Sequence, residues 1–543
     1  MTSAINHLPK EVLHLVFSWL ARIDEPEPID RTVSLPVEDT VLPPAKKPTR
    51  TIFSDATHLG WITATHVCRR WRNLILKMPL LWAGIAGGVL PSYQICEAII
   101  KRARDHPLHF WHWHTFKIHR LRLARVVTQL LPLHRDRLES LALPIMDSLD
   151  TVALTGHTLT RLKNLYLEGM GNMPYNADHA AVDAPNLRTL HMNAIFLPFS
   201  ASSLRSLRID FRRKVNVPLA SVLDFLPFTL LLEDLELRDP YEDEDRTPAL
   251  HYPARLSHLT SLTLSGTAEQ FVPIWKSIVA PSAVNVSLRV TGEESELEIL
   301  SCLHALLSQP NKDSLRFSFD EDSGTFIMHL YASFDGPEYV TNDGKHRSTG
   351  VHLSATDIRE DYKTEICKPY DLTTALIAKL VPENIRWLDC NLILDYFNDS
   401  TLCEPYYVRD LLRLLKNVST VSVGRESDMK VLHELLCAEY TDTPFPRLRS
   451  VILKHPRDTI PNTNGTYSAV KHMLESWAYL GLICSTFLAR HTPLLRVQVA
   501  ACSVEELGGN EDAWRAQERW IRGARAWVDE MVVTDLTVQD AHS

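Results

Sequence analysis

From residue 138 onward, apolar residues recur in one short phrase: hydrophobic-x-x-hydrophobic-x-hydrophobic. Six clear copies are LESLAL, LKNLYL, LRTLHM, LRSLRI, LEDLEL and LTSLTL, which begin at Leu138, Leu162, Leu187, Leu204, Leu232 and Leu259. Their starts lie 17 to 28 residues apart. Because apolar and polar positions alternate within each copy, the phrase predicts a β-strand with one buried and one open face.

Weaker copies follow, and helical patterns lie between them. The weaker copies are IRWLDC, VSTVSV, LRSVIL and LLRVQV, which begin at Ile385, Val418, Leu448 and Leu494. Apolar residues at i, i+3 and i+4 predict helices over residues 218–226, 371–380, 407–415 and 427–436. A strand followed by a helix at this period resembles the leucine-rich repeat. The resemblance implies an α/β solenoid, built as an irregular leucine-rich-repeat arc with a parallel sheet and outer helices.

Two segments depart from this rhythm. Between residues 315 and 360, FIMHLYASF and GVHLSA predict two strands, joined as a hairpin or as an enlarged pair within the sheet. Near the C-terminus, DAWRAQERWIRGARAWVDEMV predicts one amphipathic helix that covers the end of the sheet. Its apolar face is formed by Trp514, Ile521, Ala524, Val528 and Met531.

The first 92 residues follow a different pattern. LPKEVLHLVFSWL, from Leu8 to Leu20, has the apolar spacing of a helix, with Pro9 in its first turn. Residues 24–58 carry six prolines and little periodicity, which predicts a flexible or disordered insertion. Helical spacing then resumes at WITATHVCRRWRNLILKMPLLW. This spacing predicts one amphipathic helix that ends at Met78-Pro79. Its apolar stripe consists of Ala64, Val67, Cys68, Trp71, Leu74 and Ile75.

Several of these residues resemble the anchors of an F-box, in particular the F-box-like modules of large fungal families. The anchors are Leu8-Pro9, Val67, Cys68-Arg69, Trp71, Pro79 and Trp82. The resemblance implies a small helical F-box domain over residues 1–92 and a repeat domain over residues 93–543 with a C-terminal capping helix. It also implies that a Skp-type adaptor binds Leu8, Pro9, Val12, Leu15, Val67, Trp71, Leu74 and Trp82.

The same resemblance implies a function without an active site. F-box proteins are substrate-recognition subunits of SCF-type (cullin–RING) ubiquitin ligases, so the chain is expected to hold a protein substrate and not to be an enzyme. The alternative is a non-catalytic repeat scaffold with no role in ubiquitination. A cryptic enzyme or metal protein on the same frame is a third possibility.

The composition limits the classes of partner and the compartments that are expected. A net charge of −9 disfavours a nucleic-acid partner. Nine widely spaced cysteines without a C-x-x-C pair are typical of a reducing compartment. The chain shows neither a signal peptide nor an apolar run long enough to cross a membrane, so a cytoplasmic or nuclear location is expected.

Candidate chemistry is sparse. The phosphate-binding, dinucleotide-binding, serine-hydrolase and zinc-protease motifs are all missing from the sequence. HFWHWHTFKIH could place His112 and His114 on one face of a strand as metal ligands, but a first strand of the sheet explains it better. No metal or cofactor is therefore expected. The acidic YEDEDR at residues 241–246 is most simply a solvated loop.

Substrate contacts are expected on the open face of the sheet. The x positions of each L-x-L-x strand point there. The candidate substrate-binding residues are Tyr166, Glu168, His191, Asn193, Arg208, Asp210, Glu236 and Arg238. Their mixture of donors, acceptors and both charges suits a protein or peptide partner.

Overall fold

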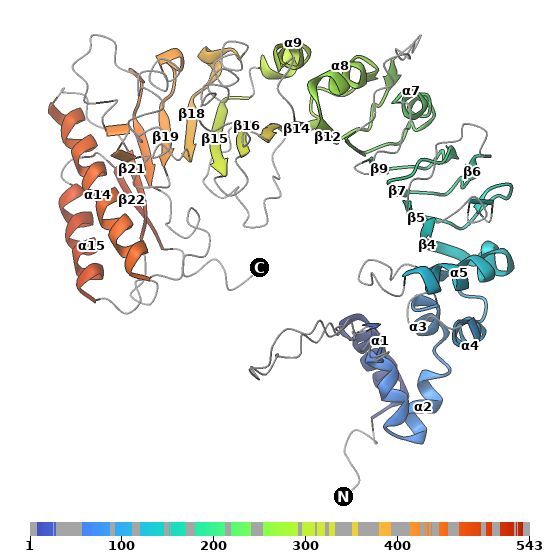
Figure 1. The fold of residues 1–543 in the computed structure, drawn as a ribbon. Coiled ribbons are helices and arrows are strands. Elements are labelled where there is room, and N and C mark those ends of the chain that lie inside the picture. The colour runs from blue at the N-terminus through green and yellow to red at the C-terminus, as the bar shows by residue number, and fades with distance from the viewer. Residues whose placement is uncertain are drawn as a thin grey trace, which may run out of the picture. The chain divides into compact units, whose positions relative to one another are not determined.

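A computed structural model describes much of the chain, in two compact units, Met1–His258 and Leu259–Ser543 (Figure 1). The described residues are 8–24, 27–28, 57–86, 93–110, 120–145, 151–152, 154–169, 180–211, 219–239, 253–291, 296–309, 312–320, 325–331, 350–356, 380–391, 413–423, 429–430, 432–433, 436, 445–453, 466–489, 496–501, 511–525, 528 and 530–535. The domain boundary predicted at residue 92 falls inside the first unit and stays a prediction.

The first unit begins with short helices around an aromatic core. They are α1 (Lys10–Ile23), the 3-10 segment η2 (Gly60–His66), α2 (Arg69–Ile75), α3 (Pro79–Gly84) and α4 (Tyr93–Ala103). Phe17 meets Trp71 edge-on with ring centroids 5.1 Å apart, and Trp61 meets Trp82 in the same way at 5.2 Å. These contacts join α1 to α2 and η2 to α3.

The two ends of the predicted insertion lie next to each other. β1 (Glu27–Pro28) pairs antiparallel with β2 (Thr57–His58), and the Trp61 N–H donates to the Asp24 carbonyl over 2.9 Å. The residues between the two strands lie outside the described part. Because the ends of the insertion meet, its length does not separate α1 from η2 and α2.

The single helix predicted after residue 61 is wrong, because the chain breaks at Cys68. The hydroxyls of Thr63 and Thr65 donate to carbonyls three residues back, at 2.7 Å each, within the 3-10 segment. Cys68 is extended, and its Sγ accepts from the Trp71 N–H at 3.4 Å as the N-cap of α2. The break turns Val67 out of the expected stripe, and its side chain is 62 % exposed.

All six clear phrases lie on parallel strands. In the first unit the sheet order is β3, β4, β5, β7, β9, β10. The bounds are β3 Leu108–Phe110, β4 Leu138–Ile145, β5 Asn164–Gly169, β7 Thr189–Asn193, β9 Ser206–Asp210 and β10 Asp234–Arg238. Each pair of neighbours runs parallel, and the second and third apolar residues of each phrase are buried. The strand prediction is confirmed for this unit.

Shorter elements complete the first unit. They are α5 (Arg120–His134), η4 (Arg135–Arg137), β6 (Val182–Asp183), β8 (Phe199–Ser200), α7 (Leu219–Leu223), η5 (Leu226–Phe228) and β11 (Ala254–Arg255). The helix predicted over residues 218–226 appears as α7 and the 3-10 turn η5. β6 and β8 pair parallel as a separate two-stranded sheet.

The second unit continues the same pattern. Its sheet order is β12, β14, β17, β16, β15, β18, β19, β20, β21, β22. The sixth clear phrase lies on β12 (Ser261–Gly266), which pairs parallel with β14 (Asn285–Thr291). The four weaker phrases lie on β18 (Trp387–Asn391), β19 (Thr420–Val423), β20 (Ser450–Leu453) and β21 (Arg496–Ala501). These four strands are parallel neighbours, so their prediction is confirmed too.

An antiparallel element interrupts the parallel strands of the second unit. β15 (Ser314–Asp320), β16 (Thr325–Tyr331) and β17 (Gly350–Thr356) form a three-stranded meander. Its outer strands β17 and β15 pair parallel with β14 and β18. The predicted hairpin is therefore confirmed as β16–β17, with β15 as a third strand.

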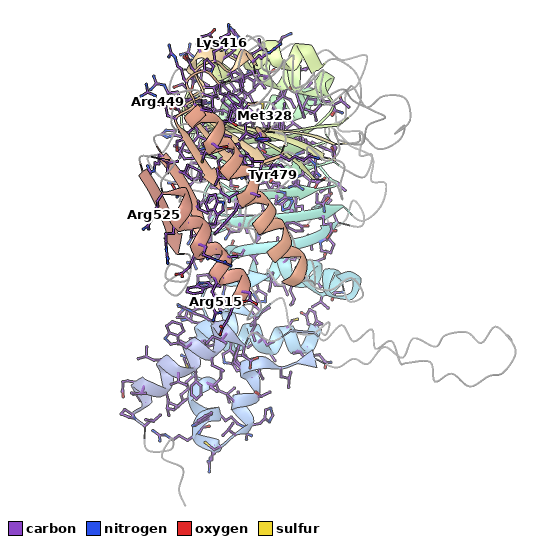
Figure 2. All side chains as sticks on the ribbon, turned by 90° about the vertical axis from the view of Figure 1, so that its left-hand side faces the viewer. Met328, Lys416, Arg449, Tyr479, Arg515 and Arg525 are labelled. Carbon is purple, nitrogen blue, oxygen red and sulfur yellow. The ribbon has the colours of Figure 1, made fainter. Side chains whose placement is uncertain are left out.

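The C-terminal helix is shorter than predicted. α15 (Glu511–Ala524) packs on α14 (Thr466–Ala489), where the rings of Trp477 and Trp520 lie 4.9 Å apart. Figure 2 shows the two helices side by side, with Tyr479 on α14 and Arg515 on α15. Beyond α15, β22 (Glu530–Asp535) pairs parallel with β21. Met531 therefore lies on a strand, because the run MVVT favours a strand over a helix.

The remaining elements of the second unit are α8, β13, α9 and η6. They span Ala268–Lys276, Ile278–Val279, Glu296–Leu307 and Pro382–Asn384. The helices predicted over residues 371–380, 407–415 and 427–436 lie largely outside the described residues. None of the described helices combines the length and the apolarity that crossing a membrane requires.

Candidate functional site

Helix α1 carries two apolar faces. Leu13 and Phe17 point inward and are at most 1 % exposed. The second face, called the outer stripe, consists of Val12, Leu15, Val16, Trp19 and Ile23, which are 38–78 % exposed. At about 100° per residue these five positions fall within one third of the helix circumference. Contiguous exposed apolar surface of this kind is typical of sites that bind other proteins, membranes or ligands.

The predicted adaptor-binding residues divide into accessible and internal ones. Pro9, Val12, Leu15 and Val67 are exposed, whereas Leu8, Trp71 and Leu74 are half-buried. Trp82 is 4 % exposed, and its Nε1 donates to the Ile75 carbonyl over 2.9 Å. Trp82 therefore stabilises the helical core of the first unit.

Sequence reasoning missed part of the accessible surface. Val16, Trp19 and Ile23 belong to the outer stripe, and Leu80 of α3 is 66 % exposed. The signal was present, because Val12, Val16, Trp19 and Ile23 repeat at four, three and four residues. Leu13 and Phe17 belong to a second apolar repeat, offset by one residue from the first. The sequence does not show which of the two repeats is buried; the packing of the folded helix does.

Two arginines of the HVCRRWRN segment connect the N-terminal helices of the first unit. Arg70 Nη2 donates to the Leu8 carbonyl over 2.6 Å, which links α2 to the start of α1. Arg72 Nε donates to the Thr65 carbonyl over 2.9 Å, across the break at Cys68. The Arg72 guanidinium thus satisfies a carbonyl just before the break, and the Arg70 guanidinium satisfies one just before α1.

The predicted substrate-binding residues come together as two rows on one sheet face. The strand register aligns Tyr166, His191, Arg208 and Glu236 in one row and Glu168, Asn193, Asp210 and Arg238 in the next. The prediction that these positions share a face is therefore confirmed. Their role in binding stays a prediction.

Contacts within these rows satisfy most of their charges. The rings of Tyr166 and His191 meet edge-on with centroids 4.5 Å apart. Arg208 Nε lies 3.3 Å from Glu236 Oε2, and Arg238 contacts both Glu236 and Asp210. Two cations and two carboxylates thus neutralise one another, so this face attracts charged ligands weakly.

A second row lies at the edge of the sheet where the strands begin. It is formed by the second residue of each phrase and is called the edge row: Glu139, Lys163, Arg188, Arg205 and Glu233. The N–H of each member after Glu139 donates to the carbonyl of the one before it, over 2.7–2.8 Å. This backbone ladder fixes the spacing of the row.

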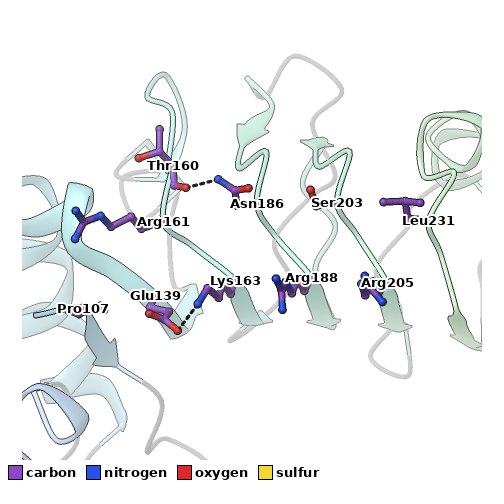
Figure 3. Close-up of a pocket in the computed structure, with 10 residues that line it drawn as sticks. All are labelled: Pro107, Glu139, Thr160, Arg161, Lys163, Asn186, Arg188, Ser203, Arg205 and Leu231. Carbon is purple, nitrogen blue, oxygen red and sulfur yellow. Dashed lines mark hydrogen bonds and ion pairs between the residues drawn. The ribbon is translucent and has the colours of Figure 1, made fainter. Parts of the chain in front are cut away.

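The edge row borders a pocket of about 400 Å³ (Figure 3). The lining residues are Pro107, Glu139, Thr160, Arg161, Lys163, Asn186, Arg188, Ser203, Arg205 and Leu231. Four cations thus face one carboxylate. Lys163 Nζ lies 2.8 Å from Glu139 Oε1, and Asn186 donates to the Thr160 carbonyl over 2.7 Å. A pocket with this charge balance favours an anionic ligand.

Sequence reasoning did not find the edge row. It followed the residues that alternate with the buried apolar ones, which are the third and fifth phrase positions and the residue directly after the phrase. The second position reads Glu, Lys, Arg, Arg, Glu and Thr over the six clear phrases. Stacking the phrases on one another would have shown this cationic run.

The histidine-rich candidate is only partly described. His109 lies on β3 with Nδ1 3.2 Å from Ser140 Oγ, which also accepts from Asn164 over 3.0 Å. His112 and His114 lie outside the described residues, as does the acidic loop 241–246. Within the described ranges, histidine, cysteine and carboxylate side chains form no group of three that could hold a metal ion.

Two charged side chains are buried in the described part of the second unit, Asp389 and Lys312. Arg316 Nε on β15 is 3.7 Å from Asp389 Oδ2 on β18, and Asp389 is 3 % exposed. Burial, together with the nearby Asp389 carboxylate, raises the pKa of Tyr331. The Arg316–Asp389 pair has a structural role, because it links β15 to β18 and each charge offsets the cost of burying the other.

Lys312 is the second buried feature. It stands two residues before β15, at a position where β5, β7, β9, β10, β12, β18, β19 and β20 have a buried leucine, isoleucine or valine. Its side chain is 2 % exposed, and no described residue accepts a hydrogen bond from its Nζ. Burial lowers the pKa of the Lys312 ammonium.

No family model matches this chain, and no curated protein matches it. Function is therefore inferred from two surfaces of the chain: the outer stripe of α1 and the edge row of the sheet.

Proposed function

We propose that this protein is the substrate-recognition subunit of an SCF-type (cullin–RING) ubiquitin ligase. Its helical N-terminal part acts as an F-box that binds a Skp-type adaptor. The strands that follow form an irregular leucine-rich-repeat solenoid that holds a protein substrate. Such a protein acts by proximity, because it raises the concentration of the substrate near the ubiquitin-charged enzyme. A cytoplasmic or nuclear location is part of the proposal.

The observation that carries the proposal is the outer stripe of α1. Leu15, Trp19 and Ile23 are 64 %, 61 % and 78 % exposed, on a helix whose other apolar face is already buried. Large apolar side chains in water are unfavourable by about 1.5–3 kcal/mol each relative to burial. A helical partner surface that covers this stripe recovers that free energy. The sequence anchors Leu8-Pro9, Val67 and Trp71 support the choice of a Skp-type adaptor as the partner.

The test is a binding assay between the purified full chain and a purified Skp-type adaptor. The wild-type chain is expected to bind. The double variant Leu15→Ser, Trp19→Ser is expected to lose at least about 30-fold in affinity, because central aromatic contacts commonly contribute 2 kcal/mol or more. The matched control is Leu133→Ser on α5, which is 64 % exposed and should leave binding unchanged.

Folding is checked by near-UV circular dichroism, since both substituted side chains are exposed and should not alter the core. A folded wild-type chain that fails to bind the adaptor rejects the ligase function. The alternative, a scaffold without a role in ubiquitination, then takes its place.

A further inference from the structure

We propose that the edge row and the exposed apolar residues beside it form a docking groove for an acidic segment of a partner protein that also carries an apolar side chain. The proposal deepens the proposed function, because it names the class of segment by which a substrate is held. It places the contact at the edge of the sheet and not on the open face.

The charge of the groove favours an acidic ligand. Arg161, Lys163, Arg188 and Arg205 line it against the single carboxylate of Glu139. Lys163 and Arg205 already pair with Glu139 and Glu233, at 2.8 and 2.5 Å. Within the described ranges, Arg161 and Arg188 have no carboxylate partner, and both are exposed. Two guanidinium groups are therefore left for carboxylates of a ligand, which they can bind through two hydrogen bonds each.

The spacing of the cations is fixed before any ligand binds. Lys163, Arg188 and Arg205 precede three neighbouring parallel strands, which lie about 4.8 Å apart. The backbone ladder links their peptide groups at 2.7–2.8 Å. The row therefore spans about 10 Å, enough for two or three acidic side chains of an extended peptide. A pre-organised row of this kind lowers the conformational entropy lost on binding.

An apolar anchor site lies at one end of the row. Leu231 lines the pocket and is 41 % exposed, and its neighbours Leu230 and Phe228 are 59 % and 74 % exposed. Exposed ion pairs alone contribute little to affinity. An apolar side chain of the ligand packed on these residues supplies the non-polar burial that surface charges lack. The segment is thus expected to combine acidic residues with at least one large apolar residue.

The length of the row favours a peptide over a nucleic acid. Carboxylates of Glu139 and Glu233 flank the three cations on both sides, so the positive stretch covers only three strands. A polyphosphate backbone requires a longer cationic track. The net charge of −9 over the whole chain also disfavours such a ligand.

The experiment is affinity selection of a random 12-residue phage-displayed peptide library on the immobilised full chain. Selected peptides are expected to be enriched in Asp and Glu together with Leu, Phe, Ile or Met. The best peptide is then labelled, and its dissociation constant is measured by fluorescence anisotropy. The double variant Arg161→Gln, Arg188→Gln should weaken binding at least about 10-fold, since each loses a charge-assisted contact.

Matched variants separate the groove from general charge effects. Arg255→Gln removes an exposed arginine of the same unit outside the pocket and should leave binding unchanged. Phe228→Ser tests the apolar end and should weaken binding of the same peptide. Equal unfolding midpoints of all variants show that the fold is kept.

Three results overturn the proposal. They are a selection without acidic enrichment, or without any binding peptide; equal binding by the wild type and the Arg161→Gln, Arg188→Gln variant; and tighter binding of a 20-nucleotide single-stranded DNA than of the best peptide. The assay contains no adaptor. Failure of adaptor binding therefore rejects the ligase function without deciding the groove, and failure here leaves the adaptor result intact.

Discussion

Replacing Lys312 by leucine is expected to stabilise the second unit. The residues two positions before β18, β19 and β20 are Ile385, Val418 and Leu448, all at most 6 % exposed. Lys312 occupies the same position before β15 with 2 % exposure and no described hydrogen-bond acceptor for Nζ. The free energy of folding therefore includes the cost of removing an ammonium group from water with no hydrogen-bond acceptor among the described residues.

The size of the effect follows from two contributions. A buried leucine contributes about 1.5–3 kcal/mol of apolar burial. Replacing buried charges by packed apolar residues has gained about 1–4 kcal/mol in other proteins. We therefore expect Lys312→Leu to raise the free energy of unfolding by about 1–4 kcal/mol. With a urea m-value of about 3 kcal/mol/M, a gain of 2 kcal/mol raises the midpoint by about 0.7 M.

The assay is urea unfolding followed by tryptophan fluorescence at several pH values. Because the folded-state pKa of Lys312 lies below its unfolded value of 10.5, the unfolded state binds more protons. Stability of the wild type should therefore rise with pH, between the lowered pKa and 10.5. Lys312→Leu should lack this rise. Lys312→Arg, which keeps a charge that cannot be released, should also lack this rise.

A Lys312→Leu variant that is no more stable than the wild type at pH 7 refutes this account of Lys312. Such a result means that the ammonium makes a favourable contact in the folded protein.

Three further predictions concern packing and thiols. Gly169→Ala should lower the free energy of unfolding by about 1–3 kcal/mol in urea titrations, because its Cβ would lie 2.1 Å from the Ala194 carbonyl oxygen; an unchanged midpoint contradicts this. Trp82→Phe should cost about 1–3 kcal/mol in the same assay, since the Ile75 carbonyl loses its donor inside the core; a neutral outcome argues against a structural role of the indole N–H. Burial raises the pKa of Cys96 to about 11, so a thiol reagent at pH 8 should modify this residue only after denaturation, as peptide mass mapping can verify.

The strands were predictable because the pattern that indicates each of them is local to a single phrase. An alternating apolar pattern such as LKNLYL fixes both the strand and the buried face within six residues. The ten strands that carry these phrases therefore lie where the sequence predicts them. The break at Cys68 was not predictable in this way, since the hydroxyls of Thr63 and Thr65 and the Cys68 Sγ compete locally with the helix.

The candidate sites were harder to predict because they depend on neighbours in space. The pairing of Arg208 with Glu236 joins two strands whose register the sequence does not state. The edge row likewise becomes a row only when the phrases are stacked. On α1, the F-box resemblance implied contacts at Val12 and Leu15, yet which of two offset apolar faces stays exposed was decided by Phe17 packing on Trp71.

The backbone ladder at the edge row has a consequence for how this protein can change. Its hydrogen bonds use only peptide groups, so the side chain at the second phrase position is free to vary without altering strand register. Substitutions of exposed residues away from special contacts usually shift stability by less than about 0.5 kcal/mol. Within the six-residue phrase, the buried leucines thus specify the sheet, and the second position is available for ligand contact. Substitution of Lys163, Arg188 or Arg205, one at a time, can change the ligand preference while the same sheet is retained.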